Sequence, residues 1–120
     1  MRSVSLLFAA ATMLVFAGAA EAHPRLVSAT PSAAISRSGR IELRFNETLM
    51  PAFSKADLVM AGQRGMPGMK MRSAVAVSRD GKTLVVTPNT RLGHGRYTVA
   101  WRAVSTDTHR VAGTYGFTVR

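Results

Sequence analysis

The sequence contains no cysteine. A disulfide framework, a cysteine-based zinc site and a lipid-modified cysteine anchor are therefore excluded. Acidic residues are also few, because 6 Asp and Glu face 16 Lys and Arg and the net charge is +10. Aromatic residues make up 7% of the chain and do not interleave with arginine clusters, so a nucleic-acid partner is not expected. The scattered basic residues favour a solvated cationic surface near an anionic lipid or an acidic partner.

One long apolar run is present, and it lies at the start of the chain. Arg2 precedes the uncharged residues 4–20, and the Ala-Glu-Ala sequence at 20–22 fits a signal-peptidase site. We therefore predict a signal peptide over residues 1–22 and one mature domain over residues 23–120, exported to the periplasm. Retention of the run as a membrane anchor is less favoured, because the run is rich in alanine and leads directly into the cleavage pattern.

After the predicted signal peptide, apolar residues recur with a period of two, which is typical of half-buried strands. Residues 40–46 alternate most cleanly and should place Ile41, Leu43 and Phe45 in the core. The Asp-Gly pair at 80–81 favours a hairpin turn. Trp101 is expected as a core aromatic. Seven strands are expected, over residues 26–29, 40–46, 56–60, 73–77, 83–87, 97–103 and 115–119. This pattern predicts an all-β fold, a seven-stranded antiparallel immunoglobulin-like β-sandwich of Greek-key type.

Cleavage after Ala22 would make His23 the first residue of the mature protein, followed by Pro24. A first-residue histidine offers two nitrogen ligands, the free α-amine and ring Nδ1, which close a six-membered chelate ring on a metal. Pro24 has no amide N–H, so the next backbone nitrogen cannot deprotonate and bind. Two nitrogens from one residue, with other ligands supplied from elsewhere, suit tetragonal Cu(II). The alternative is that His23 marks the mature start and has no other role.

Asp107 and His109 are two residues apart. In an extended chain their side chains would point the same way and converge on one ion. In a sandwich, the loop that carries them would lie near the first strand and therefore near His23. Taken alone, such a pair is more often an accident of the surface than a metal site. For Glu47 the alternative is an ordinary exposed carboxylate. His94, between two glycines, is expected in an exposed loop.

Four methionines fall within a short segment that is rich in glycine: Met60, Met66, Met69 and Met71. Thioethers are soft ligands that prefer Cu(I) to zinc, calcium or magnesium. Converging methionines would therefore form a Cu(I) site. For Met60, at a strand end, apolar gap filling explains the residue equally well. The other three lie in the expected loop, residues 62–71, where few neighbouring residues are apolar. Gap filling in a core therefore explains them less well.

Three segments of the chain carry a family resemblance. They are the mature start His-Pro-Arg-Leu-Val-Ser-Ala-Thr-Pro at 23–31, the sequence Ile-Glu-Leu-Arg-Phe-Asn-Glu at 41–47, and the W-x-x-x-S-x-D-x-H motif at 101–109. Together they resemble the CopC copper-resistance family over essentially the whole mature chain. The resemblance implies a periplasmic copper carrier on a seven-stranded sandwich, and not an enzyme.

The resemblance also implies which residues bind copper. The implied Cu(II) ligands are His23, through its amine and its ring, Asp107 and His109. Glu47 would accompany them as a weak ligand or as a neighbour of the ligands. The methionine-rich loop of some members binds Cu(I), and the residues that match it here are Met60, Met66 and Met69. Those members also carry a histidine after the Pro-Gly-Met run, which this chain lacks, and Met71 is the candidate to replace it.

Two other classes remain open at this point. A copper "histidine brace" oxidase, such as a polysaccharide monooxygenase, would use the same N-terminal histidine but needs a substrate surface with exposed aromatic residues, of which this chain has few. A sandwich domain for adhesion or assembly would bind no metal. For the copper carrier, the expected partners are copper ions and an inner-membrane copper transporter or another periplasmic copper protein. The chain is expected to be a monomer.

Overall fold

The computed structural model describes residues 23–31, 34–35 and 39–120. The predicted signal peptide and part of the loop after Pro31 lie outside the described residues. Within the described part, the chain is built from strands and turns, and no helix is long and apolar enough to cross a membrane.

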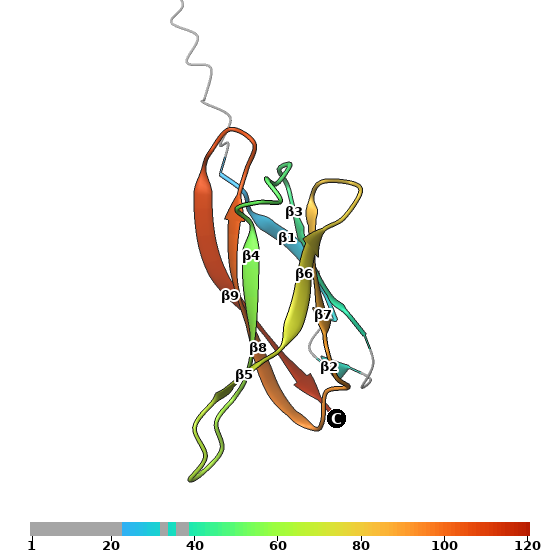
Figure 1. Cartoon of the computed structure of the whole chain (residues 1–120), viewed down its shortest axis with the longest axis vertical. Coiled ribbons are helices and arrows are strands. Elements are labelled where there is room, and N and C mark those ends of the chain that lie inside the picture. Colours follow the sequence, from blue (N-terminus) through green and yellow to red (C-terminus); the bar gives the residue numbers. More distant parts are fainter. Residues whose placement is uncertain (1–22, 32–33, 36–38) are drawn as a thin grey trace, which may run out of the picture.

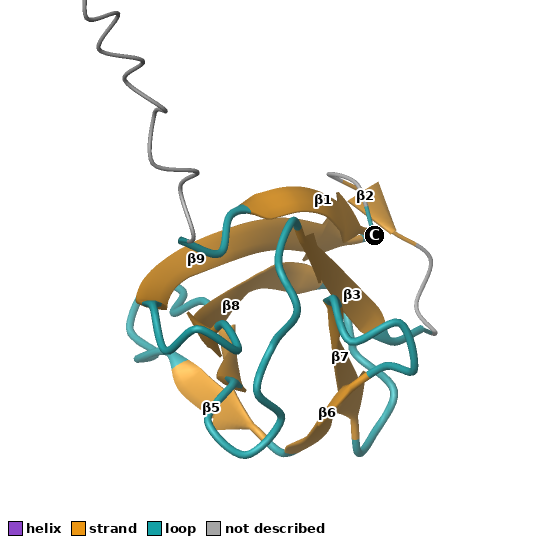
Figure 2. Cartoon of the chain, turned by 90° about the horizontal axis from the view of Figure 1, so that it is seen from above, coloured by secondary structure: helices purple, strands orange, loops and turns teal. Residues whose placement is uncertain are grey.

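Two sheets pack face to face, as Figures 1 and 2 show. The strands are β1 (Leu26–Thr30), β2 (Ala34–Ile35), β3 (Ile41–Phe45), β4 (Lys55–Met60), β5 (Met69–Met71), β6 (Ser73–Val77), β7 (Thr83–Pro88), β8 (Gly95–Val104) and β9 (Arg110–Val119). One sheet has the order β1-β3-β7-β6 and the other the order β2-β9-β8-β4-β5. All strand pairs are antiparallel except β2 with β9, which are parallel. The predicted all-β sandwich is confirmed.

The number of strands is larger than predicted. All seven expected strands are present, and β2 and β5 are added to them. β5 lies inside the segment that the sequence predicted as a loop, where Met60 pairs with Met69 and Leu58 with Met71. The prediction missed β5 because its sequence, Met-Lys-Met, contains none of the β-branched or aromatic residues that are typical of strands. Pairing with the edge of β4 decided the outcome instead.

The core follows from the alternation of side chains along the strands. Ile41, Leu43 and Phe45 of β3 are all buried, as predicted, while the residues between them are not. Trp101 of β8 is 6% exposed, and its ring meets the Phe45 ring edge-on with centroids 4.9 Å apart, which joins the two sheets. Each such side chain contributes roughly 1.5–3 kcal/mol on burial. The core therefore does not need a metal ion to hold it.

The hairpin predicted from Asp80 and Gly81 joins β6 to β7. Gly81 has a φ of 74°, which glycine adopts at little cost. The Asp80 carboxylate accepts a hydrogen bond from the Ser78 hydroxyl and others from the backbone N–H groups of Lys82 (2.8 Å) and Thr83 (3.1 Å). These bonds, that of Ser78 above all, lower the pKa of Asp80 to about 2.

The two ends of the sandwich carry the two predicted copper sites (Figure 1). At one end, which we call the turn end, lie the start of the described chain, the loop between β3 and β4, and the turn between β8 and β9. At the other, the hairpin end, lie the β4–β5 hairpin and the loop between β7 and β8. The length of β8 separates the ends, and its 10 residues span about 33 Å at the rise of an extended strand.

Candidate metal centre

His23 is held at the turn end by the two residues that follow it. Pro24 is fully buried. Arg25 donates its backbone N–H to the Asn46 side-chain oxygen at 2.6 Å, and the Asn46 N–H donates to the Arg25 carbonyl at 3.1 Å. The buried ring and this reciprocal pair fasten the chain start to the end of β3. His23, which is exposed, is thereby kept beside the β8–β9 turn.

The structure brings together three residues that the sequence predicted as ligands. The rings of His23 and His109 have centroids 4.6 Å apart, with their planes inclined by 59°. His109 Nδ1 lies 3.0 Å from Asp107 Oδ1. That distance is within ion-pair range, and Nδ1 is buried at this contact.

The turn that carries Asp107 and His109 is not extended, so the expectation that an extended chain aligns them is wrong. Thr108 between them has a φ of 73°, the left-handed conformation. Its N–H donates to the Ser105 carbonyl at 2.8 Å, and the Ser105 N–H donates to the His109 carbonyl at 3.0 Å. The two side chains converge because the backbone reverses between them.

Ser105 is a site residue that was not predicted from the sequence as such. It is 1% exposed, and its hydroxyl donates to Asp107 Oδ1. This hydrogen bond, followed by the contact with His109, lowers the pKa of Asp107 below its ordinary value. Asp107 therefore remains a carboxylate, the form that attracts a cation. The signal in the sequence was a serine two residues before an aspartate, a spacing typical of local side-chain bonds.

Glu47 lies between two residues whose backbones are tied to the site. Asn46 binds Arg25 near the chain start, and the Thr48 carbonyl accepts the Thr106 N–H at 3.0 Å. Glu47 itself is half-buried, and within the described residues its side chain takes part in no ion pair. Within residues 23–31, 34–35 and 39–120, no group of three or more His, Cys, Asp or Glu side chains is arranged so that it could hold a metal ion. The structure therefore shows two rings and one carboxylate in contact, without a completed ligand set.

The methionines gather at the hairpin end. Met60 and Met69 are directly opposite each other on β4 and β5. With Met66 they line a common hollow of ≈ 250 Å³, and Met66 and Met69 are 65% and 55% exposed. Met71 is placed differently, because it opposes Leu58, packs against the core and lines another hollow. Three of the four predicted thioethers are therefore brought together.

The β4–β5 hairpin is tight because glycine lets its two arms approach. A β-carbon at Gly62 would lie 2.8 Å from the Met66 carbonyl oxygen and 2.9 Å from the Gly68 nitrogen, which is too close for any other residue. The Met66 N–H donates to the Gln63 carbonyl at 2.8 Å and closes the tip. Exposed methionines are thus presented on a defined backbone.

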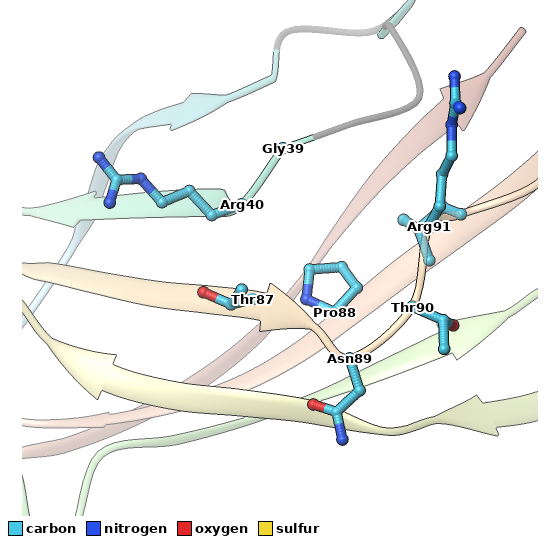
Figure 3. A pocket seen from close by; sticks show the side chains of 8 residues that line it. Gly39, Arg40, Thr87, Pro88, Asn89, Thr90 and Arg91 are labelled. Atoms are coloured by element: carbon cyan, nitrogen blue, oxygen red, sulfur yellow. The ribbon is translucent and has the colours of Figure 1, made fainter.

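Another hollow, of ≈ 460 Å³, lies beside the end of β7 (Figure 3). Arg40 and Arg91 border it, but their guanidinium groups point in different directions, and Arg40 pairs with Glu42 at 3.2 Å. A ligand site usually has a few polar groups that converge. This hollow lacks that feature and is not favoured as a functional site.

Comparison with known proteins agrees with the fold. The CopC domain model matches residues 26–120. Copper resistance protein C of Pseudomonas syringae pv. tomato is 47% identical over 115 residues, covering 92% of this chain and 90% of the relative. Its counterpart in Xanthomonas campestris pv. juglandis is 45% identical over 103 residues, covering 82% and 81%. This chain is therefore a member of the CopC domain family.

Solved structures show the same likeness. PcoC, described as a methionine-rich copper resistance protein from Escherichia coli, superposes with a TM-score of 0.76 at 42% identity, covering 82% of this chain and 100% of that one. CopC from Methylosinus trichosporium OB3b superposes with a TM-score of 0.66 at 29% identity, covering 81% and 93%.

Proposed function

We propose that this protein binds copper and carries it in the periplasm as part of copper resistance, without catalysing a reaction. Cu(II) is bound at the turn end by His23, Asp107 and His109, with Glu47 beside them. Cu(I) is bound at the hairpin end by Met60, Met66 and Met69. The names of the relatives support copper as the cargo and resistance as the role.

One observation carries the Cu(II) proposal, namely the contact of His23 with His109 next to Asp107. These residues come from opposite ends of the mature chain, and each is held in place by backbone bonds of its own. The Asp107 carboxylate lies 3.0 Å from His109 Nδ1, so an anionic group stands directly beside the two rings. Imidazole nitrogens and one carboxylate form a ligand set that suits Cu(II). The proposal also requires that export leaves His23 with a free amine.

Substitution of His109 by alanine tests the Cu(II) site. Paramagnetic resonance of the Cu(II)-loaded protein should show nitrogen ligands, and His109→Ala should change that spectrum and weaken binding. Copper at 100 times its dissociation constant should stabilise the wild-type fold by about 2.7 kcal/mol. His109→Ala should lose most of this gain yet still fold, because the core is intact without copper. An unchanged spectrum would contradict the assignment.

Asp107→Asn, with Glu42→Gln as its matched control, tests the carboxylate. Both substitutions remove one negative charge, but Glu42 pairs with Arg40 on β3. Cu(II) affinity should fall only in Asp107→Asn. Equal losses would indicate a general effect of charge and not a ligand.

Addition of one residue before His23 tests the free amine. The extension removes the amine from the chelate ring and displaces the imidazole, so Cu(II) binding should weaken sharply. Intact-mass analysis of protein recovered from the periplasm should show a chain that begins at His23. Unchanged affinity of the extended protein would end the idea of an amine ligand.

The Cu(I) site is tested by replacing Met66 and Met69 together with leucine, which preserves apolar volume. Met50→Leu is the matched control, because Met50 lies outside the hairpin. X-ray absorption of the Cu(I)-loaded protein should show sulfur neighbours that vanish in the double variant and persist in the control. Cu(II) binding should be unaffected. Cu(I) bound with nitrogen neighbours alone would mean that the methionines serve only in packing.

The structure does not favour the oxidase alternative. Phe53 is the single exposed aromatic side chain of the Phe, Tyr and Trp type in the described part of the chain. A protein surface that binds a polysaccharide normally presents several exposed aromatic rings, on which the sugar rings stack. Oxygen-dependent cleavage of a polysaccharide by the copper-loaded protein would reverse this conclusion.

A further inference from the structure

The start of β8, which follows the loop between β7 and β8, lies beside the methionine hairpin. Met60 is opposite Tyr97 in the β4–β8 pair, and the Ala61 N–H donates to the Arg96 carbonyl at 2.8 Å, which continues that pairing toward the hairpin. A β-carbon at Gly95 would lie 3.3 Å from the terminal methyl carbon of Met60. That methyl is bonded to the thioether sulfur. The backbone at the start of β8 therefore lies close to one of the proposed Cu(I) ligands.

His94 is the residue that immediately precedes this contact. It is exposed, and the residues around it are fixed. Leu92 is buried in the core, and the Tyr97 hydroxyl donates to the Gly93 carbonyl at 2.9 Å. Gly95 has a φ of 150°, which other residues rarely adopt, so the chain bends at a defined point next to His94. The backbone position of His94 at the hairpin end is thus a property of the fold.

A hollow of ≈ 570 Å³ lies between the hairpin and the start of β8. It is lined from the hairpin side by Ala61 and Gln63 and from the β8 side by Gly95 and Arg96. Ala61 and Gln63 also line the hollow of the three methionines. The two hollows therefore share part of their lining, and the second is bordered by Gly95, the residue that follows His94.

We infer that His94 supplies an imidazole ligand to Cu(I) at the methionine hairpin. This inference rests on the proposed Cu(I) site and adds a ligand from a different loop. Thioethers and imidazole are both ligands that copper accepts, and a ring nitrogen is a stronger donor than a thioether. The hairpin itself contains no histidine, so the second loop provides the nitrogen. Met71, which packs against the core, is then not needed as a ligand.

Two substitutions at His94 separate a ligand from a merely structural residue. His94→Asn keeps a polar residue in the turn but removes the nitrogen donor. His94→Met replaces the imidazole with a thioether, which Cu(I) also accepts. Arg91→Ala, in the same loop, is the matched control. Cu(I) affinity is measured without oxygen, in competition with a chromophoric Cu(I) chelator, and circular dichroism verifies that each variant is folded.

We expect His94→Asn to lower Cu(I) affinity at least about tenfold, the lower end of the cost of disturbing the surroundings of a bound metal. His94→Met and Arg91→Ala should bind within a few-fold of wild type. Cu(I) is diamagnetic, so nuclear magnetic resonance of the wild-type protein can follow the ring nitrogens during titration. One His94 ring nitrogen should shift strongly as Cu(I) is added.

The outcomes distinguish this inference from the proposed site. If the Met66 and Met69 double variant loses Cu(I) but His94→Asn binds normally and the His94 nitrogens do not shift, the methionine site stands and His94 is not a ligand. If the double variant keeps its affinity, both the site and the inference fail. If His94→Asn and His94→Met lose affinity equally, the residue acts through the shape of the loop, and the inference is overturned.

Discussion

Thr108 offers a direct test of how the turn end is assembled. Its φ of 73° is a left-handed conformation for a β-branched residue, which costs about 1–2 kcal/mol. Glycine at this position would remove that cost but would add roughly 0.4–1 kcal/mol of conformational entropy to the unfolded chain. Thr108→Gly should therefore stabilise the copper-free protein by about 0–1.5 kcal/mol. Cu(II) affinity should remain close to wild type, because the turn is preserved.

Proline at the same position should have the opposite effect. Proline fixes φ near about −65° and has no N–H, whereas the Thr108 N–H donates to the Ser105 carbonyl at 2.8 Å. The turn cannot close, and loss of this hydrogen bond alone costs about 1 kcal/mol. The Asp107 and His109 side chains are then no longer in contact, and Cu(II) affinity should fall by more than about tenfold, which corresponds to ~1.4 kcal/mol.

Urea unfolding of the copper-free variants measures the change in stability. Titration with Cu(II) against a competing chelator measures the change in Cu(II) affinity. Thr108 is exposed and is not part of the hydrophobic core, so Thr108→Pro should still unfold cooperatively. The reasoning is refuted if Thr108→Gly is destabilised by more than about 1 kcal/mol, since the left-handed conformation would then carry no strain for threonine. It is equally refuted if Thr108→Pro binds Cu(II) like wild type.

Three further predictions concern other parts of the molecule. Gly113→Ala should destabilise the fold by about 1–3 kcal/mol in urea unfolding, because its β-carbon would lie 2.5 Å from a Trp101 ring carbon. Gly116→Ala, whose β-carbon would find its nearest neighbour at 3.8 Å, should cost less, and equal losses would contradict the packing argument. Since the folded pKa of Asp80 is about 2 and its unfolded pKa about 3.9, its carboxylate stabilises the fold above about pH 4, and this contribution is lost as the pH falls toward 2. Asp80→Asn should therefore be less stable than wild type near neutral pH, with a difference that shrinks over that range; a constant difference would argue against it. Ser105→Ala should raise the pKa of Asp107 toward its ordinary value in a carbon-13 titration, and an unmoved pKa would mean that the Ser105 hydroxyl does not stabilise the carboxylate.

The sequence by itself determined the fold class and the identity of the core. Alternation along residues 40–46 and along β8 predicted which side chains are buried, because a strand directs successive side chains to opposite faces whatever surrounds it. The Asp80–Gly81 hairpin was predictable for a similar reason, since a turn with positive φ depends on local residue types. β5 was missed because its residues have little strand preference, and pairing with β4 is a tertiary effect.

For the candidate Cu(II) site, the sequence indicated the residues but gave the wrong geometry. Asp107 and His109 were expected to align along an extended chain, whereas a left-handed Thr108 turns one toward the other. The roles of Ser105 and buried Pro24 became visible only in the structure, because burial and long-range hydrogen bonds are not local properties.

The approach of His23 to the β8–β9 turn was expected from the fold class, but only the tertiary structure shows the two rings in contact. The tertiary structure also decided which residues of the hairpin end meet. It separated Met71 from Met60, Met66 and Met69, and it set Gly95, the residue after His94, beside Met60. Local sequence records which donors are available, but contacts between distant segments depend on strand order and register, which only the packed sheets define.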